Sequence, residues 1–62
     1  MNKHDIDEMI SDQLAAVINR QIAACDWREG YPIEVFEDEG FPCVRYESGA
    51  WWHYDIAKGE WW

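Results

Sequence analysis

The sequence predicts an α+β fold in which one N-terminal amphipathic helix packs on one face of an antiparallel β-meander of three or four strands (αβββ or αββββ). Apolar residues recur at helical spacing as far as residue 25. After residue 30, β-forming residues fill three short runs that are separated by glycine-containing turn signals. We expect residues 1–62 to form a single domain.

The helix is predicted over residues 6–25. Asp5 can cap its start, and Glu8 can reach back to the capping residue from the first turn. Gln21 interrupts the apolar stripe, either as a buried amide bonded to a sheet edge or as a sign that the stripe is broken. The stripe expected to contact the sheet comprises Ile6, Ile10, Leu14, Val17, Ile18, Ile22 and Cys25.

Strands are predicted over residues 31–37, 41–47 and 51–56, and residues 60–62 either form a short fourth strand or cover the outer side of the sheet. We expect a three-residue loop at 38–40 and a two-residue loop at 48–49. Together these loops set a register with one apolar face toward the helix, formed by Ile33, Val35, Phe41, Cys43, Trp52, Tyr54 and Ile56.

The same register leaves an aromatic patch on the opposite face of the sheet, where the helix cannot reach it. Such a patch is typical of a protein-binding surface, although the rings could instead merely complete a small sheet. The sequence therefore predicts a non-enzymatic interaction module or small regulator, of bacterial or phage type, that binds a partner protein or forms a homodimer. The predicted binding residues are Phe36, Tyr46, Trp51, His53 and Trp61.

The charge balance of 5 Lys and Arg against 13 Asp and Glu gives a net charge of −8, which disfavours direct binding to nucleic acid or to an anionic membrane. It also raises an alternative function, an acidic inhibitor that mimics nucleic acid and occupies the basic groove of another protein. A further alternative is a carbohydrate-binding platform built from the same aromatic rings. The acidic surface would comprise Asp7, Glu8, Asp12, Glu37, Asp38 and Glu39.

No set of residues predicts catalysis, a metal site or a small-molecule cofactor. Asp55 could orient the imidazole of His53, but no nucleophile accompanies them. His4, His53 and the two cysteines lack the paired spacing of a zinc site. Two cysteines are too few for a disulfide framework, and no secretory signal or membrane-spanning run is evident. We therefore expect a cytoplasmic protein with free thiols.

Overall fold

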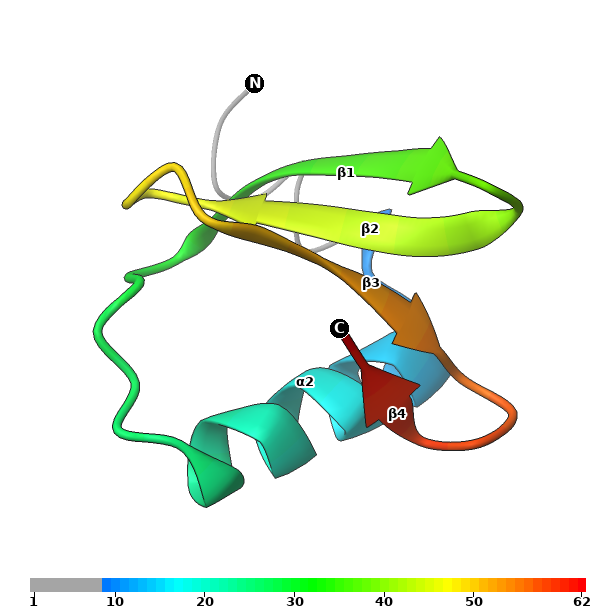
Figure 1. Ribbon diagram of the computed structural model, residues 1–62, viewed down its shortest axis with the longest axis horizontal. Coiled ribbons are helices and arrows are strands. Elements are labelled where there is room, and N and C mark those ends of the chain that lie inside the picture. The colour runs from blue at the N-terminus through cyan, green and yellow to red at the C-terminus, as the bar shows by residue number, and fades with distance from the viewer. Residues whose placement is uncertain (1–8) are drawn as a thin grey trace.

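The computed structural model describes residues 9–62, in which one helix lies on one side of an antiparallel sheet (Figure 1). The strands follow the order β1-β2-β3-β4. The predicted α+β class and the fourth strand are therefore confirmed. Within the described residues, no helix has the length and apolar character needed to cross a membrane. The elements are α2 (Asp12–Ala24), β1 (Pro32–Asp38), β2 (Phe41–Tyr46), β3 (Trp51–Asp55) and β4 (Glu60–Trp61).

Helix α2 begins at Asp12, because Ser11 interrupts the helix predicted over residues 6–25. Ser11 has an extended backbone, with φ −66° and ψ 162°. Its hydroxyl accepts a hydrogen bond from the Leu14 amide at 3.1 Å, as expected of an N-cap. The proposed Asp5 cap lies outside the described residues. At the other end Cys25 is extended and terminates the helix after Ala24.

The two main hairpin loops have the opposite lengths to those predicted. Between β1 and β2 only Glu39 and Gly40 turn the chain, with φ of 56° and 82°, as a tight two-residue hairpin requires. Between β2 and β3, Tyr46 donates its amide hydrogen to Ala50 at 2.9 Å, leaving residues 47–49 as a three-residue loop. Gly49, with φ 93°, closes this loop. Each predicted register was therefore wrong by one position.

Because side chains alternate along a strand, a shift of one position exchanges the two faces of β2. Val44 pairs with Val35 and with Trp52, so it faces the helix together with them. Phe41 and Cys43, which were expected in the core, lie on the other face. The two errors cancel between β1 and β3, so Val35, Trp52 and Tyr54 keep their predicted face.

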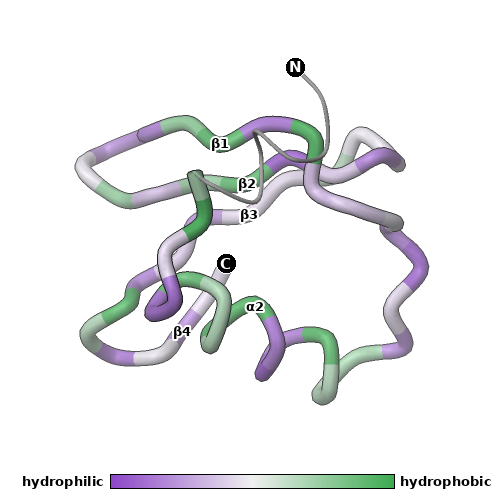
Figure 2. Tube along the Cα trace, turned by 180° about the vertical axis from the view of Figure 1, so that it is seen from behind, coloured by the Kyte–Doolittle hydropathy of each residue, from purple (hydrophilic) through white to green (hydrophobic). Residues whose placement is uncertain are grey.

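The core lies between α2 and the sheet. Figure 2 shows the alternation of hydrophobic and hydrophilic residues along α2 that supplies the helix side of it. Ile22 and Cys25, predicted in this stripe, are exposed, as are Ile33 and Ile56 at strand ends. Ile33 lies at an irregularity in the β1–β2 pairing, which removes it from the regular alternation. The buried apolar cluster comprises Leu14, Val17, Ile18, Val44, Tyr46 and Tyr54, with Ile10, Trp27, Val35, Trp52 and Trp61 packed against it.

A chain of hydrogen bonds connects α2 to the sheet inside this core. The Tyr54 hydroxyl donates to Gln21 Oε1 at 2.5 Å, and the Tyr46 hydroxyl lies 2.8 Å from that of Tyr54. All three side chains are almost completely buried. Gln21 is thus a buried amide, which was one of the two alternatives that the sequence left open. Its partner is the Tyr54 hydroxyl and not the backbone of a sheet edge. Buried polar groups paired in this way specify how the helix sits on the sheet.

We expect Tyr54→Phe to destabilise the protein by about 1–3 kcal/mol, because it leaves the buried Gln21 oxygen without its donor. Tyr46→Phe is the matched control, since Tyr54 can still donate to Gln21 in that variant. Its cost should be smaller, about 1 kcal/mol. Urea unfolding of the two variants measures the difference, and equal costs would show that the Gln21 bond adds nothing.

Stability should also fall at alkaline pH. Burial raises the pKa of both Tyr46 and Tyr54 above the ordinary value of 10.0. Above pH ~10 the unfolded chain releases phenolic protons that the folded protein retains, so the free energy of unfolding decreases, by up to about 2.7 kcal/mol per pH unit for two groups. Below that pH their contribution is fully present. Urea unfolding across this range should show the decline in wild type and much less of it in Tyr46→Phe/Tyr54→Phe.

Candidate functional site

The face of the sheet turned away from α2, here called the outer face, carries the candidate site. The pairing of the strands places two cross-strand rows on it. Phe36, Cys43 and His53 lie side by side in one row, and the backbone bonds between His53 and Trp62 extend this row to the C-terminal residue. Glu34, Arg45 and Trp51 form the next row.

Five aromatic rings on the outer face form an unbroken series of contacts. Phe36 lies 5.3 Å from Trp51, and Trp51 lies 5.2 Å from His53, measured between ring centroids. His53 stacks on Trp62 at 5.0 Å with an interplanar angle of 4°. Trp62 in turn meets the edge of Phe41 at 4.9 Å. Trp51 and Trp62 remain 41% and 48% exposed, so the series presents a broad apolar surface to solvent.

A histidine and an aspartate are paired on the outer face. His53 Nε2 lies 2.8 Å from Asp38 Oδ2, which joins β3 to β1 across β2. The His53 side chain is only 14% exposed, since Trp51 and Trp62 flank it. The predicted orienting carboxylate was Asp55, but Asp55 instead accepts a hydrogen bond from the Lys58 amide in the following turn.

Cys43 is completely buried although α2 lies on the opposite side of the sheet. Its row neighbours Phe36 and His53 flank it, and the bond between Asp38 and His53 crosses β2 beside it. Burial, followed by the negative charge of Asp38, raises the pKa of the Cys43 thiol above its ordinary value. The thiol is therefore both covered and neutral, the opposite of what a nucleophilic cysteine needs.

The structure brings together three of the five predicted binding residues, Phe36, Trp51 and His53. The expectation that Tyr46 and Trp61 join them is wrong. Tyr46 is 1% exposed and belongs to the core, because of the shifted register of β2. Trp61 pairs with Tyr54 and packs against the core on the helix side.

Sequence reasoning missed Phe41, Arg45 and Trp62 as outer-face residues. A two-residue turn at 39–40 would have placed Phe41 and Arg45 there directly. The outward position of Trp62 follows from alternation once Trp61 is paired with Tyr54 on the helix side, because successive residues of a strand point to opposite sides. It was missed because so short a strand gives little signal.

The predicted acidic residues are distributed over separate parts of the molecule. Asp7 and Glu8 lie outside the described residues. Asp12 is exposed in the first turn of α2, where its charge suits the positive end of the helix dipole. The other three, Glu37, Asp38 and Glu39, are at the β1–β2 turn.

One group of side chains has the composition of a metal site. Ligand atoms of Asp38, Glu39 and His53 lie within 4.8 Å of one another. One imidazole and two carboxylates suit divalent zinc or manganese. The hydrogen bond between Asp38 and His53 accounts for the approach of these two residues, and Glu39 is an exposed residue of the adjoining turn. We assign no metal to the group.

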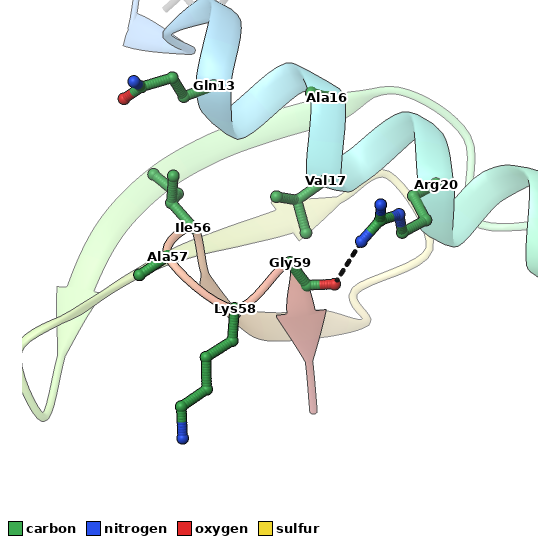
Figure 3. A pocket seen from close by; sticks show the side chains of 8 residues that line it. All are labelled: Gln13, Ala16, Val17, Arg20, Ile56, Ala57, Lys58 and Gly59. Atoms are coloured by element: carbon green, nitrogen blue, oxygen red, sulfur yellow. Dashed lines mark hydrogen bonds between the residues drawn. The ribbon is translucent and has the colours of Figure 1, made fainter.

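A groove of about 500 Å³ lies on the helix side, between α2 and the β3–β4 turn (Figure 3). Val17 and Ile56 form apolar walls, and Arg20 donates to the Gly59 carbonyl at 3.4 Å. The Lys58 side chain points away from α2. Because its polar groups do not converge, this groove lacks the features of a specific small-molecule site.

Comparison of the chain with known protein families, curated proteins and solved structures finds no match. The candidate site is therefore defined by its geometry.

The buried position of Cys43 predicts unequal thiol reactivity. Exposed Cys25 should react rapidly with Ellman's reagent, whereas Cys43 should react only when the outer face opens. His53→Ala removes a flanking ring and should accelerate the slow phase about tenfold or more.

Val17→Ala is the control for this measurement, because it loosens the core on the helix side and leaves the outer face unchanged. It should accelerate the slow phase only as far as its loss of global stability requires. Equal acceleration, at equal stability, in both variants would show that His53 does not cover the thiol.

Proposed function

We propose that this chain is a non-enzymatic interaction module that binds another protein through its outer face. The observation that carries the proposal is the unbroken series of five rings, with Trp51 and Trp62 exposed, on the side of the sheet that α2 leaves open. Tryptophan is among the residues that contribute most at protein interfaces. Strands hold these rings in place, so little conformational entropy is lost on binding.

The side chains of the outer face support binding rather than catalysis. His53 and Asp38 resemble part of a catalytic dyad, but His53 is enclosed between two tryptophans. The neighbouring thiol of Cys43 is buried and has a raised pKa, so it supplies no nucleophile. The pair is better explained as a structural bond that holds the aromatic surface together.

The charge of the chain favours a partner other than a second copy. Two copies that met through their outer faces would bring two molecules of net charge −8 together. Carboxylates such as Asp38 and Glu39 would then approach one another near the contact. We therefore do not expect a homodimer, and the experiment described below would detect one.

The remaining functional alternatives have less support. The acidic inhibitor would need its carboxylates spread over one rigid surface, whereas Asp38 is bonded to His53 and Asp12 lies on α2. The carbohydrate platform shares the aromatic rings but has no observation of its own. We also propose a cytoplasmic location, which suits the exposed free thiol of Cys25, and no direct contact with nucleic acid or membrane.

Trp51→Ala and Trp62→Ala should each weaken binding to a partner at least tenfold, because each truncates an exposed ring of the surface. The partner is captured with the wild-type chain, purified, and titrated against each variant by calorimetry. Ile22→Ala, which truncates an exposed apolar residue on α2, is the matched control and should bind like wild type.

Sedimentation equilibrium of the wild-type chain accompanies this test. A dimer that dissociates in Trp51→Ala would show that the partner is a second copy of this chain and not a different protein. Equal binding by all three variants, with circular dichroism confirming that each is folded, would contradict a role for the outer face. A steep loss of binding at high salt with no effect of the tryptophan variants would favour the acidic inhibitor instead.

A further inference from the structure

We infer that the segment recognised by the outer face is apolar with lysine or arginine at one end, and that this cation binds at the end of the sheet that carries the β1–β2 and β3–β4 turns. The inference rests on the proposed function and adds the chemistry and direction of the partner. Two observations carry the inference. Charge is distributed unevenly along the outer face, and Arg45 on this face is already held by a carboxylate and an aromatic ring.

Charge on the outer face is concentrated at one end. The β1–β2 and β3–β4 turns lie at the same end of the sheet (Figure 1). Asp55 pairs with Glu60 there, and Asp38 pairs with Phe41. Glu39 occupies the β1–β2 turn itself. Among the described residues, this end has one lysine, Lys58 in the β3–β4 turn, and one arginine, Arg20 of α2, which donates to the Gly59 carbonyl of that turn. The four carboxylates therefore outnumber these two cations.

The opposite end of the outer face shows how this surface accommodates a cation. Arg45 Nε lies 2.9 Å from Glu34 Oε1, and its guanidinium carbon lies 5.6 Å from the centre of the Phe36 ring. The guanidinium is therefore held by a carboxylate and an aromatic ring together. Both interactions favour a cation, the first by charge and the second by the negative face of the ring.

The acidic end offers the same two kinds of group to an external cation. Glu60 and Trp62 are alternate residues and lie on the same side of β4, and Trp62 contacts Phe41. Glu39 and Glu60 are exposed and form no ion pair with another described residue. A lysine or arginine placed here would meet carboxylates and rings, as Arg45 does at the other end.

The rest of the outer face determines the rest of the recognised segment. Between the two ends the surface consists of the rings of Phe36, Trp51 and Trp62, which favour apolar side chains. Acidic side chains are disfavoured by the charge of the whole chain. The partner segment is therefore expected to consist of apolar residues with lysine or arginine at one end, and this basic end should lie over the two turns.

The test uses the isotope-labelled full chain and three synthetic peptides with blocked ends. All share an alternating leucine and serine segment, which is followed by arginine and lysine, by glutamine, or by glutamate. The indole signals provide internal controls, because Trp51 and Trp62 belong to the outer face and Trp27, Trp52 and Trp61 to the core side. The basic peptide should bind about tenfold more tightly than the glutamine peptide and should shift the Trp51 and Trp62 indole signals most.

Variants then locate the cation. Glu39→Gln/Glu60→Gln removes two charges from the acidic end and should weaken the basic peptide about threefold to tenfold at low salt, with a smaller effect at high salt. Asp26→Asn/Glu29→Gln removes two charges from the connection between α2 and β1 and is the matched control, since Glu29 bonds Ser48 in the loop between β2 and β3. Binding by the control should change much less, because this loop is at the opposite end of the sheet from the proposed contact.

Three outcomes would overturn the inference. Equal affinity for the basic and glutamine peptides at the outer face would show that this face does not recognise a cation, and the proposed function would be unaffected. Equal weakening by the two double variants would show only a general charge effect. Shifts confined to Trp27, Trp52 and Trp61, or no shifts with any peptide, would show that no such segment binds this face. The proposed function fails separately, when Trp51→Ala and Trp62→Ala leave the binding of the captured partner unchanged.

Discussion

The pairing of β2 with strands on both sides is the constraint on which the rest of the structure depends. A central strand has no freedom to choose its faces independently, because its hydrogen bonds to β1 and β3 fix the alternation in all three strands. This register turns Val44 and Tyr46 toward α2 and Phe41 and Cys43 away from it. The hydrophobic core and the aromatic outer face are therefore two results of one set of backbone bonds.

On the helix side, this register gives a small core a specific internal structure. Apolar burial is not directional and would tolerate several positions of a helix on a sheet. The bonds from Tyr46 to Tyr54 and from Tyr54 to Gln21 are directional and are satisfied in one arrangement. Trp27, which lies in the connection after α2, closes the core by contacting Tyr46 and Trp52.

On the outer side, the same register produces a surface that is apolar in its centre and charged at its ends. The bond between Asp38 and His53 joins β1 to β3 across β2, and His53 lies between two tryptophans. Arg45 is neutralised by Glu34 at one end, whereas the exposed Glu39 and Glu60 leave the other end negative. A rigid apolar strip with a charged end suits recognition of a segment that is itself apolar and charged at one end.

The sequence by itself determined the elements and their order, because helical periodicity, β-forming runs and glycine turns are local signals. It also placed Phe36, Trp51 and His53 on one face, since these strands kept their alternation. The faces of β2 were decided by the tertiary structure, through two loops whose lengths each differ from the predicted length by a single residue. Glu39 adopts a positive φ that non-glycine residues seldom choose, and only the pairing of the strands imposes it. The contacts of Asp38 with His53, and of Gln21 with Tyr54, likewise join residues far apart in the chain and follow from packing that no local pattern encodes.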